Sequence, residues 1–550
     1  MAGGRPMTGL ADLPARLLTK VRAAHDHDRL VRDFARVMRT GRPTTTGTGP
    51  RIGIATFGSG GWHFVLEALL AHALAARGAR PSLLVCDLPE LPICDERTIH
   101  SRHREHCDGC LNDKRPLLDA CGLPWLGLRR LVPADALSRA RATVANLDAG
   151  AIDTFRLRGW PIGQWLHVSA CHYLRCDARG DTGEKVETRR RLLATALVAV
   201  EAVEQWLDET RPDIVIAESG AHLVWRVAFE LARARGIPVV CREIGKGGWD
   251  HHLYALNADC MAPDLAEAWA LAGPSPLSVA EDAAVDRFLR ELPERTYAQR
   301  TPIVSAAPSE LRARWGIPAA ARVAVAFTNV TWDLATAGRD VAFTGVFDWL
   351  QETVGALQSH SAAHLIIRAH PAEASVLTRE RILDQIAHQW PGGLPGVTLM
   401  PPEDATGARA VCRMADLVLA YNSSVAIEAA ADGHAVLVSG QPHYRGKGFT
   451  IDVMSRQGYR SMLQQWAGGA AIAAPASATA LARRYAHLFF LRYHVPMGWT
   501  TSPLEPPYRL TITSRHELEP GRNPALDAVC QGILEQRQVL LPRAAAGESA

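Results

Sequence analysis

Two stretches of the chain repeat the same order of apolar strand, turn and amphipathic helix. The first begins at Arg51–Phe57, a short apolar run that leads into the glycine-rich turn 58–61 and then into a helix with apolar positions at helical spacing. The order returns further on, where strand Asp213–Ala217, a helix over 222–235 and strand Val239–Cys241 follow one another. Alternation of this kind predicts a parallel sheet with helices on both faces.

A second series with the same pattern starts at Arg322–Thr328. It continues through a helix over 345–358 and through four further apolar runs, His364–Ala369, Val397–Met400, Leu417–Tyr421 and Ala435–Val438. The proline-rich stretch 272–310 between the two series is interpreted as the linker. The predicted fold class is therefore α/β, with two similar domains and a ligand site in the cleft at the carboxyl ends of their strands.

These patterns divide the chain into four parts. They are an N-terminal helical segment (1–50), a first α/β domain (51–300) with a Cys/His-rich insertion near 94–121, a second α/β domain (301–490), and a C-terminal extension and tail (491–550). We expect the helix over 10–40 to pack on the main body. A membrane-surface helix, and with it a peripheral membrane contact, is the alternative, because Arg16, Lys20 and Arg22 lie among its apolar residues.

Composition and charge argue against several classes of protein. The chain has 550 residues, of which 47% are hydrophobic and 21% charged, as in soluble globular proteins. A net charge of +3 gives no basic footprint for nucleic acid. The sequence shows no apolar run near the ~20 residues that span a bilayer and no signal peptide, and its eleven cysteines do not form a secreted disulfide pattern. We expect a reduced, cytoplasmic protein.

Three strands of the second domain end in polar residues, at the edge where open α/β sheets bind ligands. These residues are Arg368 and His370, then Asn422, Ser423 and Ser424, then Gln441. Ser423 and Ser424 stand at a helix start, where hydroxyl and backbone N–H groups suit a phosphate, and His370 offers a further donor. Each motif alone is also an ordinary helix cap or strand exit, but together they predict a phosphate site.

Longer blocks carry a resemblance to a known family. They are Phe327–Asp333, Ile367–Glu373, and the run from Ala415 through Tyr421–Ser424, Glu428 and Gly433 to Tyr444–Phe449. These blocks resemble the donor domain of bacterial capsule-type GT-B glycosyltransferases, and Pro212–Gly236 with Arg242–Gly245 resembles the N-terminal half of the same family. The His-Pro and Ser-Ser elements are also similar to those of bacterial sialyltransferases and capsule Kdo transferases.

The resemblance implies a GT-B fold, with two Rossmann-like domains facing across a cleft, the acceptor on the first and the nucleotide-sugar donor on the second. It implies transfer of a sugar from a CMP- or UDP-linked donor to a glycan or lipid-linked acceptor in capsule or other surface polysaccharide biosynthesis. Residues implied to bind the donor or its phosphate are His370, Ser423, Ser424, Asn329, Thr331, Arg368, Glu428, Gln441 and Lys447. We expect no cofactor requirement and metal-independent chemistry, since protein groups can stabilise the departing phosphate.

The acidic motif that supplies the general base in those sialyltransferases is missing from this sequence. Candidates for the base are therefore sought at strand ends of the first domain, where Glu218 and Glu243 stand, and in His63 after the glycine-rich turn. The alternatives are structural, since Glu243 can pair with its neighbour Arg242, and His63 can cap or pack its helix.

Only five lysines occur in the chain, and two of them, Lys246 and Lys447, lie between glycines. Such lysines can reach an anion unobstructed, but a solvated surface position is the interpretation we favour for both. If the donor sugar is acidic, its carboxylate needs a cation. Lys447 and Arg445 are then the better candidates, because Arg368 can instead serve a structural ion pair.

A cysteine-rich segment holds a spacing typical of zinc knuckles, Cys107-x2-Cys110. Its cysteines are Cys94, Cys107, Cys110 and Cys121, with His100, His103 and His106 between them. A second CxxC is missing, so reduced cysteines in an insertion loop are the favoured interpretation and a structural zinc is the alternative.

Two other functions remain open beside the glycosyltransferase. One is a nucleotide-sugar epimerase or hydrolase of the same architecture, which would convert the donor without an acceptor. The other is a non-catalytic glycan- or nucleotide-binding subunit, which would bind without turnover and tolerate neutral replacements at Glu218 and Glu243.

Overall fold

The computed structural model describes residues 13–40, 47–58, 61–94, 97, 99, 103–246, 248–291, 304–374, 377–501 and 509–543, without the side chains of 13–25 and 103–106. Parts of some sequence predictions lie outside these residues: the first residues of the N-terminal helix, Ser59-Gly60 in the first turn, residues 292–303 of the linker, His100 with the side chains of His103 and His106, and the tail from residue 544.

The first sheet has the strand order β13-β6-β5-β4-β1-β2-β3. Its strands are β1 (Arg51–Thr56), β2 (Arg80–Val85), β3 (Trp125–Gly127), β4 (Ile214–Glu218), β5 (Val239–Ile244), β6 (His251–Leu256) and β13 (Val495–Pro496). β1 to β5 are parallel, while β6 and β13 are antiparallel to their neighbours. The parallel part therefore has the Rossmann-like order 3-2-1-4-5.

The second sheet repeats that order with every strand parallel. Its order is β12-β11-β10-β7-β8-β9. The strands are β7 (Arg322–Phe327), β8 (Ala363–Arg368), β9 (Val397–Met400), β10 (Leu417–Ala420), β11 (Val436–Val438) and β12 (Ile451–Asp452). Two Rossmann-like domains confirm the predicted α/β, GT-B-type fold class. In each sheet the strand order reverses at one place, between β1 and β4 and between β7 and β10, which is where such sheets bind ligands.

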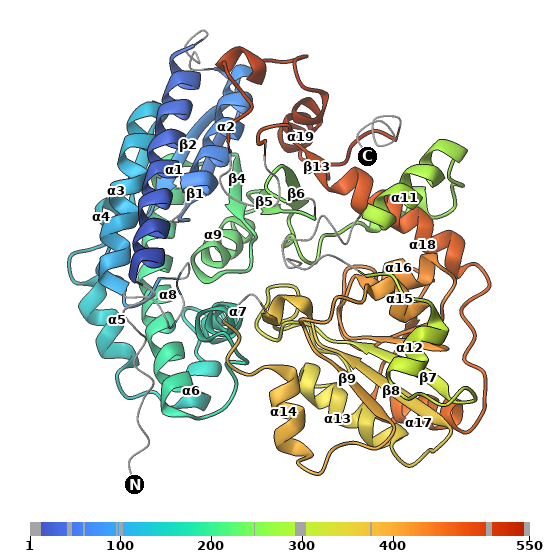
Figure 1. Ribbon diagram of the computed structural model, residues 1–550. Helices are drawn as coiled ribbons and strands as arrows, with labels where there is room; N and C mark the ends of the chain where they lie inside the picture. Colours follow the sequence, from blue (N-terminus) through green and yellow to red (C-terminus); the bar gives the residue numbers. More distant parts are fainter. Residues whose placement is uncertain are drawn as a thin grey trace.

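Helices cover both sheets (Figure 1). With the first sheet go α1 (Leu13–Arg39), α2 (Gly61–Ala76), α3 (His103–Cys121), α4 (Leu128–Leu131), α5 (Ala136–Val144), α6 (Ala149–Asp153), α7 (Ile162–Leu174), α8 (Gly183–Thr210), α9 (Leu223–Ala234) and α19 (Pro524–Leu534). The remaining α-helices are α10 (Ala266–Ala272), α11 (Val279–Glu291), α12 (Pro308–Arg314), α13 (Val346–Leu357), α14 (Ile382–Gln389), α15 (Ala408–Cys412), α16 (Val425–Ala431), α17 (Arg456–Ala467) and α18 (Ala478–Ala486). Shorter helical turns occur at Pro371–Ala374, His487–Tyr493 and Arg515–Leu518.

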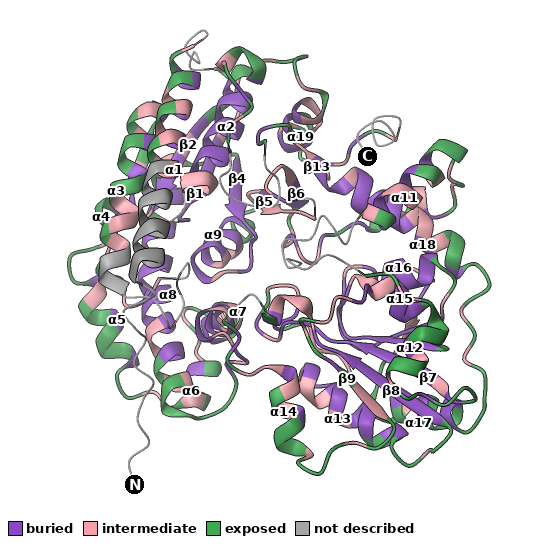
Figure 2. Cartoon of the chain, in the orientation of Figure 1, coloured by how far each residue is buried: buried purple, intermediate pink, exposed green. Residues whose placement is uncertain are grey.

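The N-terminal helix packs on the main body, as the favoured interpretation expected. Leu30, Phe34 and Val37 of α1 are buried, and the Phe34 ring meets Phe64 of α2 edge-on. α2 is buried from Phe64 to Ala75 because α1, α3 and α19 surround it (Figure 2). None of the helices described has both the length and the apolar character required to cross a membrane.

The chain passes between the domains more than once. The proline-rich stretch interpreted as a linker contains α11, whose Phe288 stacks on Phe490 near the end of the second domain. After that point the chain returns to the first sheet through β13, and α19 then packs on α2. The C-terminal extension thus completes the first domain in space, although it follows the second in sequence.

Strand boundaries differ slightly from the sequence prediction at the first reversal. Glu218 is the last residue of β4, and β5 extends to Ile244, so that Glu243 lies inside the strand. β5 is longer because the unpredicted strand β6 pairs with it, with Glu243 opposite Leu253. The pairing holds Glu243 in extended backbone at the carboxyl end of the sheet.

Candidate functional site

The first reversal point brings together the three residues proposed as general bases. His63 lies in the first turn of α2 and Glu218 at the end of β4, and the imidazole Nδ1 is 2.6 Å from the Glu218 Oε1. The Trp249 ring packs edge-on against His63, with 4.8 Å between ring centroids. Glu243 is close enough that the charges of His63 and Glu218 both change its pKa.

A buried arginine lies next to the cluster of His63, Glu218 and Glu243. Arg242 of β5 is 1% exposed, and its Nη2 lies 3.9 Å from carboxylate oxygens of both Glu218 and Glu67. A buried guanidinium requires nearby anions, because desolvating an unpaired charge is very costly. Glu67 was not anticipated from the sequence, although it is the one acid in the apolar run Phe64–Leu70.

The surroundings of the three glutamates give them different pKa values. Burial alone would raise the pKa of Glu218, but the His63 imidazole and the Arg242 guanidinium reverse the effect and lower it to about 2. Burial raises the pKa of Glu67 and of Glu243 to about 7, the negative charge of Glu218 adding to the effect. Glu218 is therefore a permanent anion at neutral pH, whereas Glu243 titrates there.

The second reversal point is built from neutral polar groups. The backbone N–H of Asn422, just past β10, donates to the Asn329 Oδ1, just past β7, over 3.1 Å. The side-chain amide of Asn422 is buried, and neither its oxygen nor its nitrogen has a hydrogen-bond partner among the residues that the structure describes. A buried polar group without a partner is rare in folded proteins and points to a ligand or water at that position.

Gly440 at the end of β11 permits this arrangement. A Cβ atom on Gly440 would lie 2.3 Å from the Asn422 Oδ1 and 2.9 Å from the Tyr421 carbonyl oxygen. Only a glycine can therefore stand beside the Asn422 amide.

His370 follows β8 and presents a donor. Its Nδ1 accepts a hydrogen bond of 3.1 Å from the Ala372 N–H, which assigns the ring proton to Nε2. Burial, together with the positive charges of Lys246 and Arg368, lowers the pKa of His370 to about 4. At neutral pH the ring is therefore an uncharged Nε2–H donor, as expected for a group that contacts a phosphate.

Lys246 joins the two domains, and the interpretation of this residue as a solvated surface lysine is wrong. Its ammonium, on the turn after β5, donates to the Ser424 hydroxyl at the start of α16. Burial lowers the pKa of Lys246, and the buried carboxyl of Glu428 opposes that effect. Glycine neighbours leave this side chain unobstructed, which was the sequence signal for it.

Ser423 lies beside that contact. Its carbonyl oxygen accepts a 2.7 Å hydrogen bond from the Tyr444 hydroxyl, and its own hydroxyl accepts from the Val425 N–H. The structure thus brings His370, Ser424, Glu428 and Lys246 into one neighbourhood.

Other residues predicted to bind the donor lie in different surroundings. Arg368 is buried, and its guanidinium contacts the Met400 sulfur at 2.9 Å. Gln441 is exposed. Arg445 donates to the carbonyl oxygens of Val438, Gly440 and Val453, so its role is structural. Lys447 is half-buried, and its pKa is lowered by burial and partly restored by Asp264.

A cavity of about 400 Å³ opens between the domains, and Thr331 lines it. From the first domain it is lined by His167, Asp177, Arg179 and Lys185, and from the second by the loop after β7, the start of α13, Glu380 and Gln385. Two ion pairs cross beside it, Arg179 to Asp340 at 2.9 Å and Lys185 to Glu380 at 3.0 Å. The cleft predicted between the domains is thus confirmed.

The predicted zinc knuckle stays a prediction. Cys107 and Cys110 lie half-buried on α3, whereas Cys121 at its end is buried with its Sγ 3.7 Å from the His72 Nε2. Among the described residues, the group able to hold a metal ion does not include these cysteines and consists instead of His167, Cys171 and Asp177.

Comparison with known proteins supports the sequence resemblance. Residues 339–464 match the family model described as capsule polysaccharide biosynthesis protein. This segment contains β8 to β12 and every predicted second-domain site residue except Asn329 and Thr331. The family resemblance drawn from the sequence motifs is confirmed over this part of the chain. No curated protein matches the chain.

Several solved structures are similar to parts of this chain at low scores. The beta Kdo 2,4 transferase KpsC of Thermosulfurimonas dismutans is 15% identical, with 56% of this chain and 86% of that chain covered and a TM-score of 0.34. A beta Kdo 2,7 transferase of the same protein is 13% identical over 52% and 79%, with a TM-score of 0.30. A putative UDP-N-acetylglucosamine 2-epimerase of Listeria monocytogenes is 13% identical over 80% and 96%, with a TM-score of 0.26. At these scores the matches carry no argument about function.

Proposed function

We propose that the chain is a glycosyltransferase of capsule or other surface polysaccharide biosynthesis, which moves a sugar from a nucleotide-sugar donor to a glycan or lipid-linked acceptor. One observation carries the proposal. Lys246 lies three residues after Glu243 and bonds to Ser424 of the other domain, which links the residues proposed as the base to those proposed to bind the phosphate. The family match of the second domain supports the same assignment.

In this proposal the second domain stabilises the leaving nucleotide. The bond between the anomeric carbon of the sugar and the phosphate oxygen breaks, and negative charge develops on that oxygen. The Nε2–H of His370, the Ser424 hydroxyl and the Lys246 ammonium would lie around it. Preorganised donors in a buried site stabilise such charge strongly, because they need not reorient during the reaction. We expect the chemistry to need no metal for this step.

The first domain would activate the acceptor. The acceptor hydroxyl attacks the anomeric carbon as its proton passes to His63, whose other ring nitrogen is held by the ionised Glu218. A histidine oriented by a carboxylate is an established arrangement for a general base. Glu243, whose pKa of about 7 also suits the role, is the alternative base, and Arg242 keeps Glu218 charged.

The donor nucleotide is proposed to be CMP- or UDP-linked. If the sugar is acidic, Lys447 is the better candidate for its carboxylate, because the Arg445 guanidinium already binds backbone carbonyls. Lys447→Ala should then weaken use of the intact donor much more than binding of the free nucleotide. Equal losses for both would exclude a role in binding the sugar carboxylate.

The first experiment measures donor-dependent nucleotide release by the purified chain with UDP-, GDP-, CMP- and dTDP-linked sugars and glycan acceptors. His63→Ala should lower kcat about 10²–10⁴-fold, with little change in nucleotide affinity. Glu218→Gln should act in the same direction. His370→Ala and Lys246→Met should weaken both turnover and nucleotide binding, because they change the phosphate side.

Glu243→Gln and Arg129→Ala serve as comparisons. Glu243→Gln distinguishes the two candidate bases, because a loss of kcat as large as that of His63→Ala would assign the role of the base to Glu243. Arg129 lies in an exposed pair with Glu90 and should leave turnover unchanged. Full activity in His370→Ala would remove the proposed phosphate site. Donor conversion at an equal rate without acceptor would identify an epimerase or hydrolase, and binding without turnover a non-catalytic subunit.

A further inference from the structure

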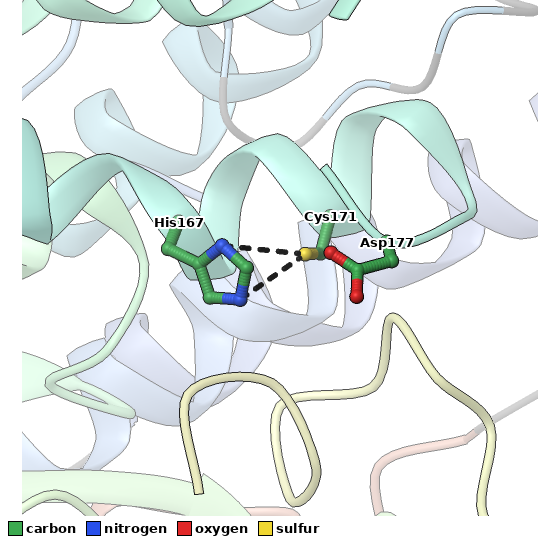
Figure 3. A group of neighbouring side chains, drawn as sticks. All are labelled: His167, Cys171 and Asp177. Atoms are coloured by element: carbon green, nitrogen blue, oxygen red, sulfur yellow. Dashed lines mark hydrogen bonds between the residues drawn. The ribbon is translucent and has the colours of Figure 1, made fainter. Parts of the chain in front are cut away.

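Three side chains with metal-ligating atoms meet at the end of α7 (Figure 3). His167 and Cys171 are four residues apart on this helix, so they project from the same face. The helix ends at Arg175, which adopts a left-handed conformation with φ of 58° and turns the chain back. This turn places Asp177 beside the other two side chains.

The spacing of the ligand atoms fits a metal ion. The His167 Nε2 lies 3.7 Å from the Cys171 Sγ, and the ligand atoms of all three residues lie within 4.8 Å of one another. Zinc bonds of about 2.0 Å to nitrogen and 2.3 Å to sulfur predict a tetrahedral N···S edge of about 3.5 Å. The imidazole and thiol are therefore already spaced for a common ion, and the carboxylate needs a shift of about 1 Å.

We propose that His167, Cys171 and Asp177 bind one divalent transition-metal ion, best matched by Zn²⁺, with a fourth coordination position open to the interdomain cavity. Imidazole, thiolate and carboxylate are ligands that zinc accepts together, and the harder ions Mg²⁺ and Ca²⁺ do not favour sulfur. His167 and Asp177 both line the cavity. A cavity ligand with a hydroxyl or carboxylate oxygen would complete the coordination.

Neighbouring groups orient these ligands. The Ala178 N–H donates to the Cys171 Sγ over 3.3 Å, which stabilises a thiolate. The backbone N–H of Arg179 donates to the Asp177 Oδ1 over 2.9 Å, and the Arg179 guanidinium binds the same carboxylate. The guanidinium contacts both oxygens, with Nε 3.0 Å from Oδ1 and 2.9 Å from Oδ2, and Nη2 2.5 Å from Oδ2. A carboxylate has about four lone-pair sites, so the three donating hydrogens of Arg179 leave one site for a metal.

The proposed site is connected to the contact between the domains. Arg179, which holds Asp177, also pairs with Asp340 of the second domain at 2.9 Å. A metal ion that draws Asp177 toward itself therefore changes the partner of a residue that bridges the cleft. The inference does not depend on the proposed sugar transfer, because none of its residues takes part in that mechanism.

The test uses metal-stripped full-length protein titrated with Co²⁺, a spectroscopic substitute for Zn²⁺. Wild type should bind one equivalent and develop a thiolate-to-cobalt charge-transfer band, which added Zn²⁺ should displace. Cys171→Ser should abolish the band, and His167→Gln and Asp177→Asn should each weaken Co²⁺ binding at least tenfold. Zn²⁺ should raise the melting temperature of wild type and not of Cys171→Ser.

Matched cysteine variants separate this site from other thiols. Cys176→Ser removes a neighbouring buried cysteine, and Cys107→Ser/Cys110→Ser removes the knuckle spacing; both should keep the band. Absence of the band in wild type, its persistence in Cys171→Ser, or its loss in Cys107→Ser/Cys110→Ser would each overturn the proposal. Circular dichroism of the metal-free variants checks folding. If Cys171→Ser does not fold, undiminished Co²⁺ affinity in His167→Gln overturns the proposal in the same way.

Discussion

The two reversal points of the molecule share one scaffold and have opposite electrostatics. At the first, between β1 and β4, buried charges gather: Glu67, Glu218 and Arg242, with His63 at the surface of the group. At the second, between β7 and β10, the groups that follow the strands are the neutral amides of Asn329 and Asn422 and an uncharged His370. The ionisable groups nearby are the buried Arg368 and Glu428 and the Lys246 of the first domain. The comparison shows that strand order sets where a site lies, while the residues at the strand ends set whether it holds protons or binds an anion.

The difference follows from what each edge must do in the proposed reaction. A base requires a lasting charge nearby, and the ionised Glu218 supplies it. Ionised carboxylates would repel a phosphate, and burial raises the pKa of the nearby Glu428 carboxyl, which favours its neutral form. Lys246 supplies the second edge with a cation from the first domain.

The largest loss of stability should come from removing the buried Arg242 of the first region, and the buried Arg368 of the second region is the comparison. Arg242→Met leaves two buried carboxylates without their cation and should lower the free energy of unfolding by about 3–5 kcal/mol. Arg368→Met should cost much less, because no carboxylate lies within ion-pair distance of Arg368 among the described residues. Urea unfolding of both variants measures the contrast. If Glu67→Gln/Arg242→Met regains part of the lost free energy of unfolding, the pairing of Arg242 with the buried carboxylates is supported. Equal losses of stability in Arg242→Met and Arg368→Met would contradict it.

A smaller effect should come from Gly440→Ala in the second region. The added Cβ would clash with the Asn422 Oδ1 at 2.3 Å, so we expect a loss of about 1–3 kcal/mol together with weaker nucleotide binding. Gly355→Ala is the control, since a Cβ there meets nothing within 4 Å on α13 and should stabilise the helix by up to about 1 kcal/mol. Thermal unfolding measures both. Unchanged stability in Gly440→Ala would show that Asn422 moves aside at no cost.

Opposite responses of stability to pH should appear as well, each bounded at about 3 kcal/mol, because one pKa unit corresponds to about 1.4 kcal/mol. The pKa of Glu243 is raised from 4.5 to about 7, so the folded state keeps a proton that the unfolded chain loses, and stability falls as pH rises from 4.5 to 7. The pKa of His370 is lowered from 6.5 to about 4, so its effect is lost stability as pH falls from 6.5 to 4.

Melting temperatures measured across pH 4–8 test the opposite pH dependences of stability expected for Glu243 and His370. Glu243→Gln should remove the decline between pH 4.5 and 7, and His370→Gln should remove the decline on the acid side. Unaltered profiles in both variants would mean that neither group titrates as described. Exposed His516 offers a control histidine, because it pairs with Glu519 at the surface.

Much of the fold could be predicted from the sequence, and less of the site. The five strands predicted for the second domain lie within a residue of their predicted ranges, because buried parallel strands are continuous apolar runs bounded by turns, whereas the two-residue strand β12 was not predicted. His370, Ser423 and Ser424 could be proposed from the sequence because strand ends of such sheets carry ligand groups, and their role in binding a phosphate stays a prediction. Glu67 and the group His167, Cys171 and Asp177 were missed, because a single polar residue on an apolar helix carries no signal of its partner.

By itself, the sequence determined two α/β series, their strand ends and the polar residues that stand there, because periodicity and turn residues are local properties. Only the tertiary structure decided which of those residues meet. The contact of Lys246 with Ser424 spans 178 positions and that of Asn422 with Asn329 spans 93, and both depend on how the sheets face and how their strands are ordered. The protonation of Glu218 and Glu243 was decided there too, since burial and neighbouring charges set a pKa and neither is written in local sequence.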